Sequence, residues 1–488
     1  MTITPAEYHF VLDQVFASAG RPEPVRPAAG PAPAADAVQR VLAEVERNRI
    51  ELIRFLWVDH GSITRGKAVA AGSLAARMDS GIGLAKTRQS AGLSDVGPAL
   101  PGFDAVGEVR LVPDPDSFVV LPHAPGSAAM LCDLRTLEDQ PWDACPRGFL
   151  RQALEAAAEL GFEVVAAFEP EFTLCSAKPG PGRLDLFDES LCFDNEGFDA
   201  AADFSVELSR ALRSQGMDVQ TYHPEFGAGQ HELTLRHAPA MRAADQFVWQ
   251  RAFTRGLARR RGLWATFAPV PAPGMRGNGN HVHLSLWRRP ESGGPAVNAF
   301  AADGSGPGSE LGLSATGRHF VAGLLAHLPG LCALSCASVN SYQRLRPGMW
   351  SGAHLGYGFD NREAAVRIPS PLSGDRAGTT NIEVKACDAT ANPYLVLGAL
   401  IQAGLDGIRR RLDPGEPLTG DPTHSAGEVP LLPGSLPEAV DALEADAFLT
   451  GVLGPVRGTV YPAIKRADTR DAERLGAELS HHLHTLHY

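Results

Sequence analysis

The segment 162–174, FEVVAAFEPEFTL, is the clearest predicted strand in the chain, and it carries two acids among apolar neighbours. Residues two apart on a strand point to the same side, so Glu169 and Glu171 face one way. A helix-like pattern, RGFLRQALEAAAELG, precedes the strand and ends at Gly161. A solvated strand face is the simple explanation of such an acid pair. A buried pair would be costly without compensating positive charge, and this favours a binding site.

The chain changes character at Pro146. Beyond it, strands and helices alternate as far as GAELSHHLHTLHY, which we expect to be helical, and residues 175–190 and 288–312 are expected to be loops. Before it, we expect a helix from Asp36 to Asn48 and a strand–turn–strand over residues 50–70, in a small mixed sheet. Residues 1–35 form a Pro/Ala-rich extension, with a short helix expected over 5–18. The predicted fold class is α+β, with domains at 36–145 and 146–488.

Composition limits the kinds of function to consider. The chain has 488 residues, a formal net charge of −12 and 44% apolar residues, which is typical of a globular protein. The acidic balance and the lack of a basic run argue against nucleic-acid binding. We find neither an apolar run of membrane-spanning length nor a signal-peptide pattern, so no membrane partner is expected. Seven cysteines without a CxxC pair favour a reducing compartment, and we expect a cytoplasmic protein whose Cys332 and Cys336 are core residues.

Three further segments place acids or imidazoles on predicted strands. Glu225 and Glu232 bracket a Gly-rich turn in YHPEFGAGQHELTL, His281 and His283 share a strand face in GNGNHVHLSL, and Glu383 lies in NIEVKACD. Singly, each fits a surface or structural role. Together, five carboxylates with an imidazole in apolar strands suit Mg²⁺ or Mn²⁺, because zinc sites prefer Cys and His.

Arginines supply the complementary charge. NSYQRLRPGMW and FDNREAAVRIP place four of them within 24 residues: Arg344, Arg346, Arg362 and Arg367. Arginine beside a metal is a common way to hold phosphates and carboxylates, although salt bridges could account for some of these residues. The chain has no GxxxxGK[ST] loop and no GxGxxG after a strand, so a nucleotide would not be held by a P-loop or a Rossmann turn.

Taken in order, EPEF, EFGAGQHE, GNGNHVHLS, NSYQRL, NREAAVRIP and IEVKACDATANPYL resemble the motifs of class I glutamine synthetases over about residues 40–460. The resemblance implies a small N-terminal β-grasp domain and a large catalytic domain whose antiparallel sheet lines the active site. It also implies a homo-oligomer, a dodecamer of two hexameric rings. The implied chemistry uses ATP and two to three Mg²⁺ or Mn²⁺ ions per site. A γ-carboxylate is phosphorylated, and an amine then displaces phosphate to give an amide.

The resemblance also assigns roles to individual residues. It places Glu171, Glu225 and Glu232 on one metal, and Glu169, His281 and Glu383 on the ion that bridges the ATP phosphates. His283 and Ser285 fall on positions near ATP. Arg344 matches the arginine that grips the carboxylate of the amino acid, and Gly277 lies in the same substrate pocket. Arg362 and Arg367 match arginines that steady the phosphates and the transferring phosphoryl group.

Several positions depart from the family pattern. Ammonia-using members carry a glutamate where this chain has Trp350, and their ammonium-binding DGSS segment is not recognisable here. Arg276 replaces an asparagine beside the amino-acid substrate, and Lys385 replaces a substrate-binding arginine, which keeps the charge but loses the bidentate fork. The tyrosine-bearing adenylylation segment is missing. The pattern therefore resembles the γ-glutamylamine synthetase branch of the family.

The sequence thus predicts a ligase that joins glutamate to an organic amine. Three alternatives remain: the same chemistry on another carboxylic acid, which Arg276 and Lys385 favour; a catalytically silent homologue; and glutamine synthetase itself, which ranks last because of Trp350. All six predicted metal ligands are present, which argues against the second alternative.

Overall fold

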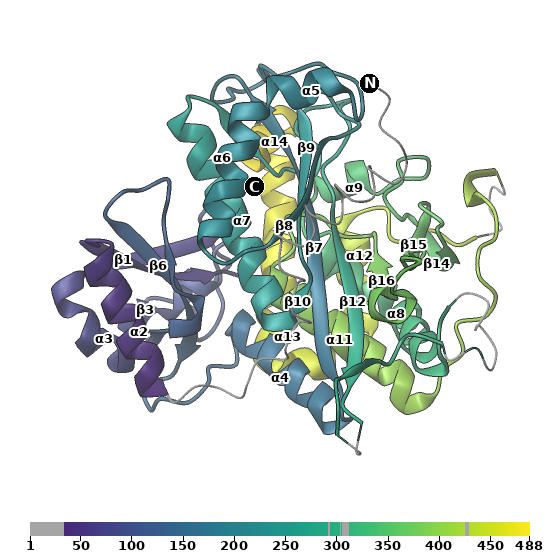
Figure 1. Ribbon diagram of the computed structural model, residues 1–488, viewed down its shortest axis with the longest axis horizontal. Coiled ribbons are helices and arrows are strands. Elements are labelled where there is room, and N and C mark those ends of the chain that lie inside the picture. Colours follow the sequence, from purple (N-terminus) through teal and green to yellow (C-terminus); the bar gives the residue numbers. More distant parts are fainter. Residues whose placement is uncertain (1–33, 291–292, 303, 305–311, 425–428) are drawn as a thin grey trace, which may run out of the picture.

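The computed structural model describes residues 34–290, 293–302, 304, 312–424 and 429–488. The N-terminal extension and its expected helix over 5–18 lie outside the described residues. Helices and sheets are mixed in two parts, as the α+β prediction requires, with the smaller, N-terminal part beside the larger one (Figure 1).

The N-terminal part is a six-stranded sheet carrying two helices. Its strand order is β2-β1-β6-β4-β3, with β5 paired to β6 and with β1 parallel to β6. Helices α2 and α3 contribute Val41, Val45, Leu74 and Met78 to its apolar core. The elements are α2 (Ala34–Arg47), β1 (Leu52–Val58), β2 (Thr64–Ala70), α3 (Leu74–Ser80), β3 (Ile82–Ala85), β4 (Glu108–Pro113), β5 (Val119–Val120) and β6 (Ser127–Arg135).

The larger part is built on a ten-stranded sheet. Its main path is β14-β15-β16-β12-β7-β9-β8, while β10 and β11 also pair with β7 and β13 pairs with β12. Its strands are β7 (Glu163–Cys175), β8 (Val219–Pro224), β9 (Gln230–Leu235), β10 (Ala238–Pro239), β11 (Trp264–Thr266), β12 (Asn280–Arg288), β13 (Val297–Asn298), β14 (His354–Phe359), β15 (Ala364–Ile368) and β16 (Ile382–Val384).

Helices cover one face of this sheet and bury its apolar side chains. Phe168 of β7 stacks on Phe247 of α7 with ring centroids 5.1 Å apart, so the acids next to Phe168 in the strand point to the opposite face. Cys332 and Cys336 are buried here, as expected. The helices are α4 (Pro146–Glu159), α5 (Asn195–Ala200), α6 (Ala202–Ser214), α7 (Ala240–Arg260), α8 (Ala315–Ser335), α9 (Ser341–Arg344), α10 (Arg376–Thr379), α11 (Pro393–Arg410), α12 (Leu436–Ala445), α13 (Ala447–Leu475) and α14 (Ala477–His487).

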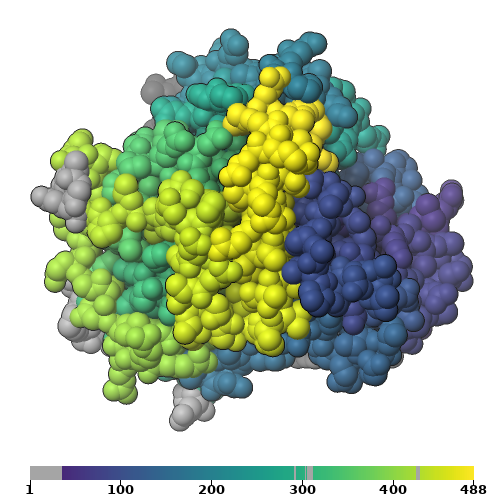
Figure 2. Space-filling model, turned by 180° about the vertical axis from the view of Figure 1, so that it is seen from behind, coloured from purple at the N-terminus to yellow at the C-terminus, as the bar shows by residue number. Residues whose placement is uncertain are grey.

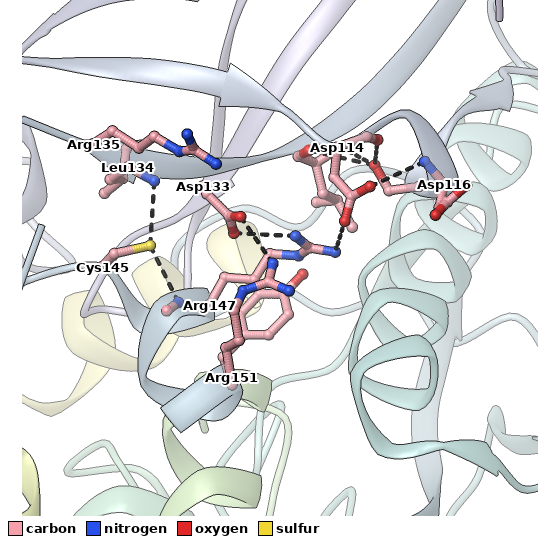
Figure 3. Close-up of polar contacts among 12 residues, drawn as sticks. Asp114, Asp116, Asp133, Leu134, Arg135, Cys145, Arg147 and Arg151 are labelled. Atoms are coloured by element: carbon pink, nitrogen blue, oxygen red, sulfur yellow. Dashed lines mark hydrogen bonds and ion pairs between the residues drawn. The ribbon is translucent and has the colours of Figure 1, made fainter. Parts of the chain in front are cut away.

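An arginine at the start of α4 joins the two parts. The guanidinium of Arg147 donates to Asp114 at 2.7 Å and to Asp133 at 3.0 Å, both from the N-terminal part (Figure 3). It also donates to Asp245 of α7 at 2.8 and 3.2 Å. Because three acids share one buried cation, the network fixes α4 and α7 against the small sheet.

The C-terminal helices lie between the two parts. From behind, α13 and α14 form a band between the N-terminal part and the rest of the molecule (Figure 2). Tyr488 is buried, and its hydroxyl donates to the carbonyl of Gly61 in the turn between β1 and β2. In the same turn, Ser62 donates to the carbonyl of Ala391. In the described residues, no helix combines the length and apolarity needed to cross a membrane.

Candidate active site

One face of the ten-stranded sheet carries a continuous row of acids, imidazoles and an arginine. Directly opposite residues on antiparallel strands have neighbouring side chains, so the register places these groups beside each other. Five of the six residues expected to bind metal lie in this row, and Glu225 follows at the end of β8. The pairs are Arg367–Glu383, Glu383–His283, His281–Glu169, Glu171–Glu232 and Glu232–His223.

Glu169, His283 and Glu383 form the first compact group, with ligand atoms within 4.8 Å of one another. His283 Nε2 lies 3.2 Å from Glu169, and His281 Nδ1 lies 3.3 Å from Glu383 and 3.9 Å from Glu169. The sequence placed His281 with these two acids; in the structure both imidazoles contact them. His283 also pairs with Asn381, its Nδ1 lying 2.8 Å from the amide oxygen.

Charge within the first group is nearly balanced. Burial favours the neutral form of Glu169, but His283 and His281 outweigh it and hold the pKa of Glu169 well below its usual range. For Glu383, burial is likewise outweighed, chiefly by Lys385, and its pKa falls to about 2. Arg367 donates to Glu383 at 2.8 Å, and Lys385 Nζ lies 3.4 Å from the same carboxylate.

His223, Glu225 and Glu232 form the second compact group. His223 Nε2 lies 2.9 Å from Glu225 and 3.9 Å from Glu232. Glu171 faces Glu232 across the strands, but one of its oxygens accepts from Gln230 at 2.6 Å and from the amide of Gly279 at 2.8 Å. The carboxylates of Glu171, Glu225 and Glu232 thus lie close together.

Positive charge is deficient on this side of the row. Burial and then the carboxylates of Glu169, Glu171 and Glu225 hold the pKa of Glu232 well above its usual range. In the described part of the chain, no lysine or arginine forms an ion pair with Glu171, Glu225 or Glu232.

A glycine allows the two groups to approach. A Cβ at Gly279 would lie 2.5 Å from Nη2 of Arg344 and 3.0 Å from Glu171 and from His281, so only glycine fits without displacing them. Gly277 is equally constrained, because a Cβ there would meet the Pro269 carbonyl at 2.4 Å. Arg344 is buried and donates to the carbonyl of Cys387, and its Nη2 lies 3.2 Å from His281 Nε2.

Comparisons with known proteins agree with this geometry. The profile described as glutamine synthetase, catalytic domain, matches residues 143–481, and that of the glutamine synthetase N-terminal domain matches residues 36–142. The chain belongs to the glutamine synthetase family. The resemblance seen in the sequence motifs is therefore confirmed.

Individual relatives differ in what their names say. A γ-glutamylpolyamine synthetase, GlnA3 of Streptomyces coelicolor, is 35% identical and covers 86% of this chain and 90% of its own length. A glutamine synthetase of Pyrococcus abyssi is 33% identical over 83% of this chain and 87% of its own. A solved structure described as a novel glutamine synthase homolog has a TM-score of 0.78 and 34% identity, covering 90% of this chain and 98% of its own.

Members of the glutamine synthetase family are ATP-dependent ligases that use divalent metals, and the row fits such ions. Its donors are mostly carboxylate oxygens with imidazole, a set that suits Mg²⁺ or Mn²⁺. Within the described residues, Glu171, Glu225 and Glu232 have no lysine or arginine ion-pair partner, so a bound cation would supply the missing charge. The donor atoms of the row and their uncompensated negative charge therefore fit the divalent metals that the family uses.

Arg367, Ser285 and Arg362 are the other predicted residues near the row. Arg367 bonds to Asp360 as well as to Glu383. Ser285 continues the strand face of His283 toward the far end of β12, and its hydroxyl accepts from the indole of Trp287 at 3.0 Å. Arg362 lies with its guanidinium carbon 5.9 Å from the ring centroid of Trp350.

The surface formed by Trp350, Arg276 and Arg362 borders the row, because Arg276 lies against Gly227 in the turn after Glu225, and we refer to this surface as the mouth of the site. Trp350 is 57% exposed and has a φ of +53°, in the left-handed region. On one side, Arg276 contacts the sulfur of neighbouring Met349 at 3.4 Å and lies over the ring of Phe226 at 4.4 Å. On the other side, Arg362 lies over the indole. The mouth is therefore lined by aromatic and cationic groups.

Three residues of the site were missed in the sequence. His223 precedes Glu225 by two on a strand, so the alternation of side chains could have placed it on the same face. Gln230 orients Glu171, and Glu363 accepts from the amides of Trp350 at 2.8 Å and Gly348 at 3.2 Å. Glu363 carried no local signal, because its partners, the amides of Gly348 and Trp350 and the imidazole of His354, lie in other segments of the chain.

Proposed function

We propose that this ligase joins the γ-carboxylate of glutamate to an organic primary amine, giving a γ-glutamylamide. The observation that carries the proposal is Trp350 at the mouth of the site, where ammonia-using members carry glutamate. A carboxylate there attracts ammonium and can take its proton. An indole cannot act as a base, but its apolar face suits the carbon part of an amine, and a protonated amine can stack on it for about 0.5–2 kcal/mol.

The surroundings of Trp350 support the same substrate class. Phe226 and Met349 add apolar surface on the opposite side of the mouth, next to Arg276. The relative named γ-glutamylpolyamine synthetase is consistent with an organic amine, whereas the relatives named glutamine synthetases are consistent with ammonia. The residue at position 350 is therefore the point at which the two functions can be told apart.

The reaction proceeds in two displacements. A γ-carboxylate oxygen attacks the γ-phosphorus of ATP and ADP departs, leaving an acyl phosphate. The amine nitrogen then attacks the acyl carbon, the C–O bond to phosphate breaks, and the nitrogen loses a proton. Divalent ions held by the two acidic groups would neutralise phosphate charge.

The protein's own part is positioning and charge. Arg367, on the strand next to Glu383, faces the acidic row and can steady the transferring phosphoryl group. Arg362, at the mouth, lies near enough to Lys385 to act on its charge. Arg344 and Lys385 are the buried cations available to the carboxylate of the amino acid, and Gly277 leaves room beside Arg344. His283 and Ser285 extend the row in the direction assigned to ATP.

A second candidate is the same chemistry on another acid. Arg276 is exposed at the mouth and, in the described residues, forms no ion pair with an acid. A guanidinium in that state could receive an additional anionic group of a different acid substrate. Product mass distinguishes this case from the glutamate reaction.

The test is a panel of primary amines with glutamate, ATP and Mg²⁺, read by phosphate release and product mass. We expect feeble ammonia-dependent release and clear stimulation by at least one amine. Trp350→Glu should shift preference toward ammonia, and Trp350→Phe, which keeps an aromatic face, should retain the amine reaction. If the unaltered protein makes glutamine from ammonia as efficiently as any amide from an amine, the proposal fails.

We also propose the assembly and compartment that the family resemblance implies, a dodecamer of two hexameric rings in the cytoplasm. All seven cysteines are free, which is compatible with a reducing compartment. Mass photometry of the purified protein would give the number of subunits directly.

A further inference from the structure

A cavity lies away from the acidic row, where the two parts of the molecule meet. It has a volume of about 310 Å³ and is bounded by α7, β11, the end of α14 and the loop after β7. Ile63 and Thr64, at the turn between β1 and β2, close one side. Its size is at the lower end of the range for small-molecule sites.

The charged groups of this cavity are all cationic or imidazole. Lys178, Arg251, Arg255 and Arg259 line it together with His487, and no acidic side chain of the described residues does. In the described residues none of these four cations forms an ion pair with a carboxylate; they contact carbonyls and aromatic rings instead. Four like charges around one small cavity are costly unless an anion compensates them.

Of the two inner arginines, Arg251 is buried and Arg255 is half-buried. Arg251 donates to the carbonyl of Ala389 at 3.2 Å, and Arg255 donates to the carbonyls of Leu486 and His487. Burial lowers the pKa of Arg251 to about 10. It lowers that of Arg255 to about 9, with repulsion from Arg251 and Arg259 adding to the effect. These two residues also tie α14 and the segment after β16 to α7, so they have a structural role as well.

The outer two cations have no such role. Arg259 and Lys178 are exposed, and each lies over the indole of Trp264, at 4.8 and 5.8 Å from the ring centroid. Arg255 lies 5.9 Å from the same ring, and the indole N–H donates to the carbonyl of Thr485. Because cations already surround this indole, it offers no free face for stacking a nucleobase.

We propose that this cavity binds a compact, non-aromatic small-molecule anion with at least two negative charges. Phosphate groups and dicarboxylates share this chemistry, since both accept charge-assisted hydrogen bonds from guanidinium groups. Bound there, the anion would contact both parts of the molecule, because Thr64 lines the same cavity as α7 and α14.

The test is calorimetric titration of the full-length protein with inorganic phosphate in one arm and malonate in the other, against chloride at equal ionic strength. The double variant Lys178→Gln/Arg259→Gln removes only exposed side chains, so it should fold normally. Its matched control is Arg210→Gln/Arg213→Gln on α6, which removes two exposed charges elsewhere. Arg367→Gln controls for anion binding in the acidic row.

We expect at least one of the two anions to bind, and the Lys178/Arg259 variant to weaken it about tenfold or more, as loss of charge-assisted hydrogen bonds does. The α6 control and Arg367→Gln should bind that anion as the unaltered protein does. Absence of binding in both arms, equal weakening by the α6 control, or loss of binding only in Arg367→Gln would each overturn the proposal. So would a Lys178/Arg259 variant that changes oligomeric state while binding the anion normally, because the cavity would then be a subunit contact.

Discussion

One buried carboxylate holds the Trp350 loop in place. Glu363 accepts hydrogen bonds from the amides of Trp350 and Gly348 and lies 3.5 Å from His354. The backbone of Trp350 has a positive φ, in the left-handed region. Glu363→Ala frees this loop, so we expect the KM for the amine to rise about tenfold with little change in the KM for ATP. Steady-state kinetics on both substrates would measure this. Glu363→Gln, which keeps one acceptor, should recover part of the loss; equal effects on both KM values would contradict the positioning role.

Arg367 faces the acidic row from β15 and is only partly buried. If it stabilises charge that develops during phosphoryl transfer, Arg367→Gln should lower kcat by about 100-fold or more while the KM for ATP changes less. The matched control is Arg289→Gln, an exposed arginine whose partner is Glu163 and which lies beyond the end of β12. A near-normal kcat for Arg367→Gln would contradict this catalytic role and leave Arg367 only as the salt-bridge partner of Glu383.

At the scale of elements, α4 depends on the arginine at its start. Arg147→Met would leave Asp245, Asp114 and Asp133 without their shared cation, and we expect a loss of about 3–5 kcal/mol in the free energy of unfolding. Arg151→Met, one turn along the same helix, removes a half-exposed partner of Asp133 and should cost about 1 kcal/mol or less. Urea unfolding of both variants would measure the difference. Similar midpoints for the two would mean that the network adds nothing beyond a surface ion pair.

Local pattern was enough to predict the individual elements. The expected helix over 147–161 and strand over 162–174 are found as α4 (Pro146–Glu159) and β7 (Glu163–Cys175), and the expected C-terminal helix is α14. The order β14-β15-β16-β12-β7-β9-β8 could not be derived in this way, because it depends on pairings between distant segments. The same limit explains Glu363, whereas His223 followed a local alternation that could have been used.

At the scale of the whole molecule, buried neutral histidines occur in both parts. Burial lowers the pKa of His60, in the turn after β1, to about 3, and those of His123 and of His484, in α14, to about 4. His484 Nδ1 donates to the carbonyl of Ser480 at 2.7 Å. Because these groups titrate near 6.5 once unfolded, the unfolded chain binds protons that the folded chain does not.

We therefore expect stability to be greatest above about pH 6.5 and to fall as the pH drops toward 4. Each such histidine contributes a slope of about 1.4 kcal/mol per pH unit, so His484 alone accounts for about 3 kcal/mol between pH 6.5 and 4. The measurement is the urea midpoint of unfolding at a series of pH values. His484→Gln, which keeps a donor near Ser480 but cannot titrate, should be less stable at pH 7 and show a shallower decline in acid. An unchanged slope would mean that burial does not lower the pKa of His484 in the folded protein.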